Sequence, residues 1–321
     1  MELEKYQLIN SSKNLPFALK NEVNINEDTR YRYRYLDLRR PCRFIEVETP
    51  ILAPSSPEGA QCFVVPANRK NRYYTLPQSP QIFKQLLMMG GLGKYYQIAK
   101  SFRNEGSRSN RQIEFSQLDL ELNFTSLREI KKLVEKLLQY TLKKTFGSSL
   151  KILFTTLTYQ QVIKKYGTDK PDLRPNTKNT QELKTQKHES FRHPFTLPKK
   201  KYIKPLLNDK VKPEKVICEA LDLVCNGEEI LSGSTRIYQR NLQEKVLEIL
   251  GYNSSARENY FGYFLQALEF AAPPHGGFGL GIDRLLSIIL NSKNLKELIA
   301  FPKNIDGSCS LTGTPNYLGE N

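Results

Sequence analysis

Residues 103–121 read Arg-Asn-Glu-Gly-Ser-Arg-Ser-Asn-Arg-Gln-Ile-Glu-Phe-Ser-Gln-Leu-Asp-Leu-Glu. A polar loop separates two segments of strand-like composition, 95–102 and 115–124, which predicts a hairpin. The arginines at 103, 108 and 111 share this loop with too few acids to neutralise them. Because guanidinium groups bind phosphates in a bidentate way, the loop suits a polyanionic ligand. Solvated charges on an exposed hairpin tip are the alternative.

The composition favours the same class of partner. The 321 residues contain 48 Lys and Arg against 33 Asp and Glu, so the net charge is +15. This excess favours nucleic acid first and a membrane surface second, with compositional drift toward Lys and Asn as the alternative. Five cysteines without a C-x-x-C pair and three histidines argue against a zinc site or a disulfide framework. No apolar run reaches the length of a membrane span, so we expect a soluble chain without a membrane partner.

Hydrophobic patterning predicts the other elements. Residues 1–30 read as a linker or arm and 31–321 as one domain, in which 168–214 form surface connections. Arg30–Arg40 alternates arginine with tyrosine, which permits a strand, although a surface helix is the alternative. Helices are predicted over 81–89, 126–147, 241–250, 260–270 and 283–290, and strands over 44–52, 216–224 and 229–237. Their irregular order indicates an α+β fold.

Two of the predicted helices begin at capping signals. Ser126 and Glu129 have the spacing of a capping box, and Gly147 ends that helix. Glu244 stands at the same position of the helix that starts near Asn241, which Gly251 ends.

Further segments carry residues suited to phosphate, metal and carboxylate chemistry. Gly276–Arg284 places an arginine after a glycine-rich strand, although a packed strand-to-helix turn is the commoner reading. Asp222 and Glu229 flank a turn and could hold Mg²⁺, or they are exposed acids of an ordinary hairpin. Arg236 lies in a run of small and apolar residues, so it is either salt-bridged or awaiting an anion.

Taken in order, these segments resemble a known family. Phe102–Glu105 with Arg111–Asp119 resembles motif 2 of the class II aminoacyl-tRNA synthetases, and Gly279–Arg284 resembles their motif 3. The likeness narrows to the bacterial and mitochondrial type of aspartyl-tRNA synthetase through several collinear segments, which are 35–40, 47–50, 56–59, 76–85, 166–174, 193–196 and 272–277. The resemblance implies a mostly antiparallel sheet flanked by helices. It also implies ATP-dependent activation of L-aspartate and transfer to tRNA(Asp).

The resemblance assigns the nucleotide site. It implies that the catalytic residues Arg103 and Arg284 grip the α- and γ-phosphates of ATP, and that Asp222 and Glu229 hold Mg²⁺. The other ATP-binding residues that it implies are Glu105, Gln112, Glu229, Gly281, Ile282 and Asp283.

It also assigns the amino-acid site. Lys84 and Arg236 would bind the side-chain carboxylate of aspartate, and Asp119 and Gln81 would meet its ammonium group. Two cations facing one small side chain favour aspartate over asparagine, because a neutral amide leaves buried charge unpaired. The remaining aspartate-binding residues that the resemblance implies are Glu58 on a mobile loop, Ser79 and His193.

This chain also departs from the family pattern. From these residues, we expect no N-terminal OB-fold anticodon domain before Arg30, and we expect that the insertion within 168–214 is reduced to a basic remnant. The family's homodimer helix is missing between Pro41 and Ile45, and Gln61-Cys62 replaces Arg-Asp in the loop after Glu58.

The loop at 106–108 and the lysine-rich chain resemble the mitochondrial branch, which implies the mitochondrial matrix, with the cytoplasm as the alternative. A paralogue that does not use tRNA and an inactive RNA-binding remnant are the rival functions.

Overall fold

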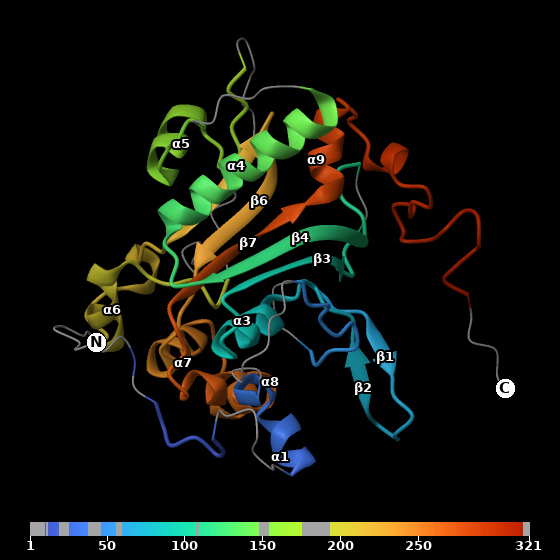
Figure 1. Cartoon of the computed structure of the whole chain (residues 1–321). Helices are drawn as coiled ribbons and strands as arrows, with labels where there is room; N and C mark the ends of the chain where they lie inside the picture. The colour runs from blue at the N-terminus through green and yellow to red at the C-terminus, as the bar shows by residue number, and fades with distance from the viewer. Residues whose placement is uncertain are drawn as a thin grey trace.

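The core of the molecule is an antiparallel sheet of five strands in the order β3-β4-β7-β6-β5 (Figure 1). The computed structural model describes residue 10 and residues 12–18, 26–37, 46–55, 60–106, 109–147, 154–174 and 193–316. The strands are β3 (Lys94–Phe102), β4 (Glu114–Asn123), β5 (Ala220–Cys225), β6 (Glu228–Thr235) and β7 (His275–Gly281). The predicted α+β class, with a mostly antiparallel sheet flanked by helices, is confirmed.

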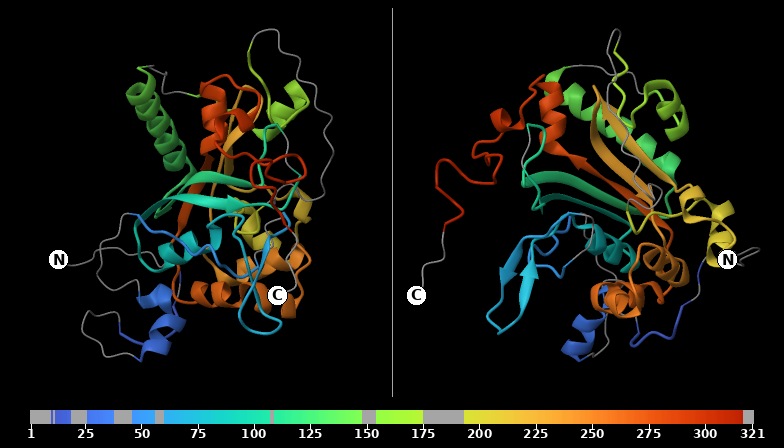
Figure 2. Two further views of the ribbon diagram at one scale, coloured as in Figure 1. Left: turned by 90° about the vertical axis from the view of Figure 1, so that its right-hand side faces the viewer. Right: turned by 180° about the vertical axis from the view of Figure 1, so that it is seen from behind.

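The two faces of the sheet have different chemistry because side chains alternate along a strand. Leu118 and Leu120 of β4 pack with Phe278 and Leu280 of β7 in the core beneath helix α4 (Leu127–Phe146). The residues between them in sequence therefore face away from α4. In the left panel of Figure 2, α4 lies on one side of the sheet, and α5 (Tyr159–Tyr166) and α6 (Lys200–Leu207) lie on the other.

Helices α3 (Gln81–Met89), α7 (Arg240–Ile249) and α8 (Ser254–Leu268) gather at one edge of the sheet (Figure 1). Their contacts form a second core that contains Ile82 and Met89 of α3 and Phe261 and Phe264 of α8, all buried. α3 has the predicted bounds, and its buried side includes the polar residues that the site uses.

The predicted capping box of α4 is confirmed, because Glu129 N–H donates to the Ser126 side chain and the Glu129 carboxylate accepts from Ser126 N–H. Gly147 ends α4 in the left-handed conformation that favours glycine. The capping box predicted with Glu244 is wrong. α7 has no side-chain cap, and Glu244 instead accepts from Arg240 Nε at 2.9 Å, one helical turn away.

Other predictions also need correction. For Arg30–Arg40 the helical alternative is correct and the strand is wrong where the segment is described, because α1 (Glu27–Arg32) and α2 (Arg34–Asp37) are short helices. Tyr33 and Tyr35 turn to pack on Phe270, so tertiary contact outweighs the alternation. The strand predicted over 44–52 is reduced to one bridge at Glu46, and residues 41–45 lie outside the described residues.

The segment 168–214 is not only surface connection. Where it is described it contains α6, whose Leu206 is buried against Ile237, Leu242 and Val246. The remaining elements are the β1–β2 hairpin (Val64–Pro66 and Tyr73–Thr75), α9 (Ile282–Ile289) and the 3₁₀ turns η2 (Pro213–Lys215) and η3 (Leu295–Leu298). Within the described part of the chain, no helix combines the length and apolarity needed to cross a membrane.

Candidate active site

A buried cluster of four charged residues lies on the sheet face opposite α4. Lys84 Nζ of α3 lies 2.9 Å from Asp119 Oδ1 and 3.3 Å from Glu121 Oε2, both on β4. Arg236, which follows β6, donates through Nε to Glu121 Oε1 at 2.9 Å and through Nη1 to Ser234 Oγ at 2.6 Å. All four side chains are at most 5% exposed. The structure therefore brings Lys84, Asp119 and Arg236 together as predicted.

Glu121 is the member of the cluster that the sequence analysis did not identify. Its two oxygens link the guanidinium of Arg236 to the ammonium of Lys84. Burial raises the pKa of Glu121, but the two cations outweigh burial and hold the pKa below its usual value. The spacing was a usable signal, because residues two apart on a strand share a face and Asp119 was already assigned to the site.

Asp119 differs from Glu121 because one of its oxygens lacks a partner. Its Oδ2 is buried and accepts no hydrogen bond from any described residue, and burial raises the pKa of this carboxyl despite Lys84. Gln81 Nε2 is a second buried polar atom without a described partner. Such unpaired groups are costly in a folded protein, and a polar ligand bound beside them would satisfy both. As placed, the Gln81 atom is a donor, and it meets an ammonium only with the amide turned by 180°.

His193 lies where the amino-acid cluster and the nucleotide-side residues meet. The pKa of His193 is lowered to about 4. Burial is the largest cause, the positive charges of Arg236, Arg103 and Lys84 act in the same direction, and Glu229 opposes them. Charges act on an imidazole in this way only over short distances, so Arg103 and Glu229 lie in the same region of the molecule as Lys84 and Arg236. His193 is neutral at pH 7.

The motif 2 hairpin presents Arg103 beside the ring of Phe115, with the guanidinium carbon 5.2 Å from the ring centroid. Glu105 forms an ion pair with Arg111 across the described part of the loop, and Arg108 lies outside the described residues. Gln112 is buried and engaged with the C-terminal segment. It donates to the Lys303 carbonyl at 3.3 Å and accepts from the Lys303 N–H at 2.8 Å. Gln112 thus fixes the position of the 303 segment in this conformation.

Arg284 and Glu229 meet at the start of α9. Arg284 Nη1 donates to the Glu229 carbonyl at 2.8 Å, and Asp283 Oδ2 accepts from the Ser116 N–H at 3.2 Å. Gly281 and Ile282 form the junction of β7 and α9, because Gly281 is the N-cap of this helix. Arg103 and Arg284 therefore lie near the same end of β4, since Arg103 is beside Phe115 and Asp283, the neighbour of Arg284, accepts from Ser116.

The two carboxylates predicted to bind metal lie on neighbouring strands. Glu229 is paired in register with Val224, two residues along β5 from the exposed Asp222. The Glu229 side chain also forms a 2.9 Å ion pair with Lys170, a residue that the sequence analysis did not place in the site. Among the described residues, no group of three or more His, Cys, Asp or Glu could hold a metal ion. This pair suits Mg²⁺ that takes most of its oxygen ligands from phosphates and water.

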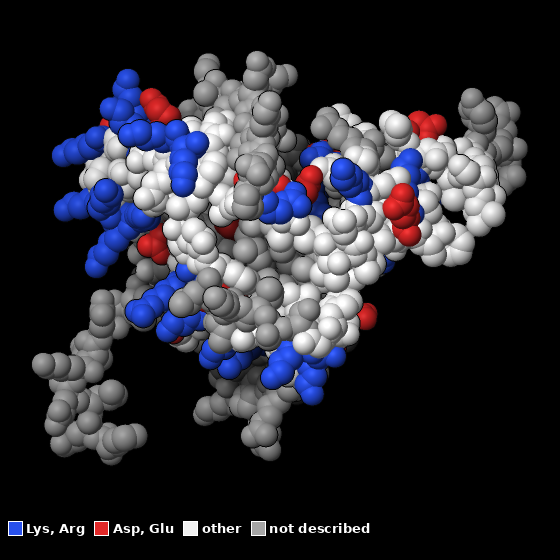
Figure 3. All heavy atoms as spheres, turned by 90° about the horizontal axis from the view of Figure 1, so that it is seen from above, with Lys and Arg blue, Asp and Glu red and all other residues white. Residues whose placement is uncertain are grey.

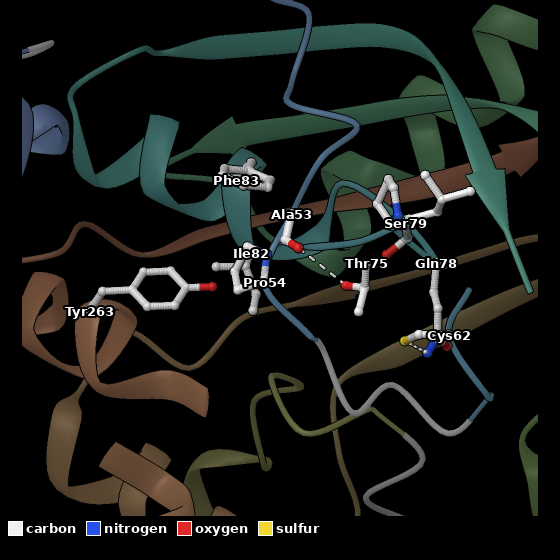
Figure 4. A pocket seen from close by; sticks show the side chains of 11 residues that line it. Ala53, Pro54, Cys62, Thr75, Gln78, Ser79, Ile82, Phe83 and Tyr263 are labelled. Atoms are coloured by element: carbon white, nitrogen blue, oxygen red, sulfur yellow. Dashed lines mark hydrogen bonds between the residues drawn. The ribbon is translucent and has the colours of Figure 1, made fainter. Parts of the chain in front are cut away.

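Ser79 lies beside a small cavity at the start of α3 (Figure 4). Its volume of about 20 Å³ leaves room for one water, so aspartate and ATP do not fit there. Gln78 Nε2 donates to the Ala60 carbonyl at 2.7 Å and to Cys62 Sγ at 3.1 Å. These contacts anchor the end of the loop whose predicted substrate residue, Glu58, lies outside the described residues.

Comparison with known proteins agrees with this geometry. The family described as tRNA synthetases class II (D, K and N) matches residues 41–305. The chain belongs to this family of class II tRNA synthetases. The aspartate–tRNA(Asp/Asn) ligase of Dictyoglomus turgidum is 31% identical over 98% of the chain and 80% of that protein. The aspartate–tRNA ligase of Buchnera aphidicola is 31% identical over 97% of the chain and 82% of that protein.

A solved structure supports the fold. The asparaginyl-tRNA synthetase of Entamoeba histolytica superposes with a TM-score of 0.62 over 86% of this chain and 69% of that one, at 19% identity. The alignment with the Buchnera protein is 480 residues long, so that protein carries segments inside the matched region that this 321-residue synthetase lacks.

Two residues outside the predicted site hold the cluster in place. His275 Nδ1 lies 2.8 Å from the Pro273 carbonyl oxygen, and His275 Nε2 lies 3.2 Å from Gln85 Oε1. Its backbone carbonyl accepts from the Arg236 N–H at 2.9 Å, so His275 links the neighbour of Lys84 to Arg236. A Cβ on Gly277 would lie 2.3 Å from Glu121 Oε2, so glycine leaves the room that Glu121 needs.

Proposed function

We propose that this synthetase is an aspartate–tRNA ligase, which activates L-aspartate with ATP and transfers it to the 3′ end of tRNA(Asp). The charge of the buried cluster carries the proposal. Lys84 and Arg236 face two carboxylates, Asp119 and Glu121, so the cluster is balanced by itself. Once a ligand ammonium engages Asp119, about one positive charge remains for a ligand carboxylate. Asp119 Oδ2 is left to accept from a ligand ammonium. An amino acid with a short acidic side chain complements both charges.

The same balance favours aspartate over asparagine. A neutral amide in place of the side-chain carboxylate would leave the excess positive charge of Lys84 and Arg236 buried without a counterion. A site built around such a charge rejects the uncharged analogue more strongly than its size alone would allow.

The activation step needs no protein nucleophile. The α-carboxylate of aspartate attacks the α-phosphorus of ATP in line, a new P–O bond forms, and pyrophosphate leaves. Arg103 would bind the α-phosphate and Arg284 the γ-phosphate, where they stabilise the charge that develops. A terminal ribose hydroxyl of tRNA then takes the aspartyl group, and AMP leaves.

Mg²⁺ would be held by Asp222 and Glu229 and would neutralise charge on the leaving pyrophosphate. Glu229 can take this role only by loosening its ion pair with Lys170. Lys170 thus pairs with the carboxylate that would bind the metal. The proposal therefore includes separation of Lys170 from Glu229 when Mg²⁺ binds.

The test is amino-acid-dependent exchange of pyrophosphate into ATP, measured with each of the twenty amino acids. We expect exchange with aspartate alone. Arg103→Ala should abolish it while the circular dichroism spectrum stays unchanged, and Arg128→Ala, an exposed arginine of α4, should retain it. Full exchange in the Arg103→Ala protein would refute the role of Arg103.

The exchange assay, combined with assays of aspartyl transfer and of RNA binding, separates the rival functions. Exchange with aspartate but no aspartyl transfer to tRNA(Asp) would indicate a paralogue that makes another product. Salt-dependent RNA binding without exchange would indicate an inactive remnant. The closed network of Lys84, Asp119, Glu121 and Arg236 favours an active enzyme, because a site without function has no reason to keep four charges buried.

Compartment and assembly belong to the same proposal. The lysine-rich composition favours the mitochondrial matrix, which fluorescence imaging of the tagged chain tests. The short segment between Pro41 and Ile45 cannot hold the helix that this family uses for its homodimer, so we expect weak dimerisation at most, measured by light scattering.

A further inference from the structure

One exposed surface of the described chain is strongly basic. Residues 199–215, which contain α6 and η2, carry seven exposed lysines and two acids. We call it the α6 lysine surface, and its lysines are Lys199, Lys200, Lys201, Lys204, Lys210, Lys212 and Lys215. One of the two acids, Asp209, is engaged by Lys245 at 2.7 Å. None of the seven lysines forms an ion pair with a described residue, so their charge faces solvent.

The packing of α6 makes this surface a fixed platform. Leu206 of α6 and Val216 after η2 are buried with Ile237, Leu242 and Val246 in one core. Because the apolar side of α6 is held against α7, its lysines are directed outward. Two bridges fasten the entrance to α6, one between Thr196 and Arg236 and one between Pro198 and Cys218.

The α6 lysine surface lies close to the active site along the chain. His193 is six residues before Lys199, so at most about 20 Å of extended backbone separates them. The bridge between Thr196 and Arg236 joins the same segment to the charged cluster. In Figure 2, α6 lies on the side of the sheet opposite α4. Asp119 and Glu121 face the same side as α6, because they alternate along β4 with Leu118 and Leu120, which pack beneath α4. Figure 3 shows lysine and arginine side chains gathered at the left, where Figure 1 places α5 and α6.

We propose that the α6 lysine surface binds the phosphate backbone of the tRNA while the 3′ end occupies the active site. This inference rests on the proposed function. A lysine ammonium contacts phosphate as a point charge without reading bases, so the surface adds affinity and orientation but not tRNA identity. The α4 face offers a control, since its exposed lysines at 132, 136 and 143 lie on the other side of the sheet.

The test compares two triple variants of the full chain. One is Lys200→Ala, Lys201→Ala, Lys204→Ala on α6, and the other is Lys132→Ala, Lys136→Ala, Lys143→Ala on α4. Binding of fluorescent tRNA(Asp) is measured by anisotropy over a range of salt concentrations. We expect the α6 variant to bind on the order of tenfold more weakly, with a salt slope smaller by about 2–3, because three phosphate contacts are lost. The α4 variant should bind like the unchanged chain.

Exchange and melting measurements keep the result interpretable. Both variants should exchange pyrophosphate with aspartate at the unchanged rate and melt at the unchanged temperature, because their substituted side chains are exposed. An unchanged affinity and salt slope in the α6 variant, or an equal loss in the α4 variant, would overturn the inference. Absence of exchange in the unchanged chain would instead refute the proposed function. The comparison of tRNA binding by the two variants would still test the α6 lysine surface by itself.

Discussion

At the scale of single residues, Glu121 determines what the site can bind. It is fully buried and bonded to Arg236 at 2.9 Å and to Lys84 at 3.3 Å, so it sets the charge that remains for a ligand. Without it, two buried cations would face each other with Asp119 alone. The role of Glu121 is therefore both structural and electrostatic.

Replacing this carboxylate tests that role. Glu121→Gln should lower the free energy of unfolding by about 3–5 kcal/mol, because it leaves the buried Arg236 without its carboxylate partner and Lys84 with Asp119 alone. The measurement is urea unfolding followed by circular dichroism. Glu105→Gln breaks the partly exposed pair with Arg111 and should cost at most about 1 kcal/mol. Equal effects of the two changes would show that the cluster is not an energetic unit.

His193 gives a prediction for pH. Its pKa is about 4 in the folded protein against 6.5 in the unfolded chain, since burial and then nearby cations disfavour the imidazolium. As the pH falls from 6.5 to 4, the unfolded chain takes up this proton first, so the free energy of unfolding falls. His193→Gln should flatten this part of the stability curve. The buried His275, whose pKa burial also lowers, contributes equally to both proteins. Parallel curves for the two proteins would contradict the assigned environment.

The sequence predicted most residues of this cluster but not how its positive and negative charges are paired. Lys84, Asp119 and Arg236 came from the resemblance, and the structure brings them within bonding distance of one another or of Glu121. Of the two alternatives left open for Arg236, the salt bridge is present, and binding of a ligand anion stays a prediction. What the sequence could not show is that one carboxylate serves both cations, since this depends on how β4 meets β6 and α3.

At the scale of elements, the approach of β7 to β4 sets the geometry of the site. Gly277 lies opposite Glu121 in this register, and Gly279 lies opposite Asp119. A Cβ on Gly277 would lie 1.9 Å from the Leu120 carbonyl oxygen, whereas a Cβ on Gly279 would meet nothing closer than 3.5 Å. Only the first of these glycines is sterically required.

The pair of glycines supplies a matched test. Gly277→Ala should destabilise the protein by about 3 kcal/mol, because the strands cannot separate without breaking the cluster. Gly279→Ala should change the free energy of unfolding by less than about 1 kcal/mol. Thermal and urea unfolding of both variants provide the comparison. A Gly277→Ala protein as stable as the Gly279→Ala protein would mean that β4 and β7 do not meet as described.

Elements with strong local signals were predictable, and those fixed by tertiary contact were not. The β3–β4 hairpin, α3 and α4 carry clear periodicity, caps or glycine ends in the sequence. α6 was missed because the lysines obscured its pattern, although Tyr202, Ile203, Leu206 and Leu207 have helical spacing. Tyr33 and Tyr35 alternate with arginine like a strand, but they form helical turns because they pack on Phe270.

At the scale of the whole molecule, the sheet order gathers residues that are far apart in the sequence. Placing β7 between β4 and β6 brings Arg284 and Arg236 beside residues of β4 and α3 that precede them by more than a hundred positions. No local pattern could reveal this order. The resemblance implied a mostly antiparallel sheet flanked by helices but gave no strand order. The central claim is that the two halves of the site form one cleft for aspartate and ATP together.

The most direct test is titration calorimetry with a non-hydrolysable analogue of aspartyl-adenylate, which occupies both halves at once. We expect one analogue per chain and a loss of affinity of at least about a hundredfold in both Lys84→Ala and Arg103→Ala, since each removes a buried or charge-assisted contact. Unchanged affinity in either variant would mean that aspartate and ATP do not bind beside each other at this site.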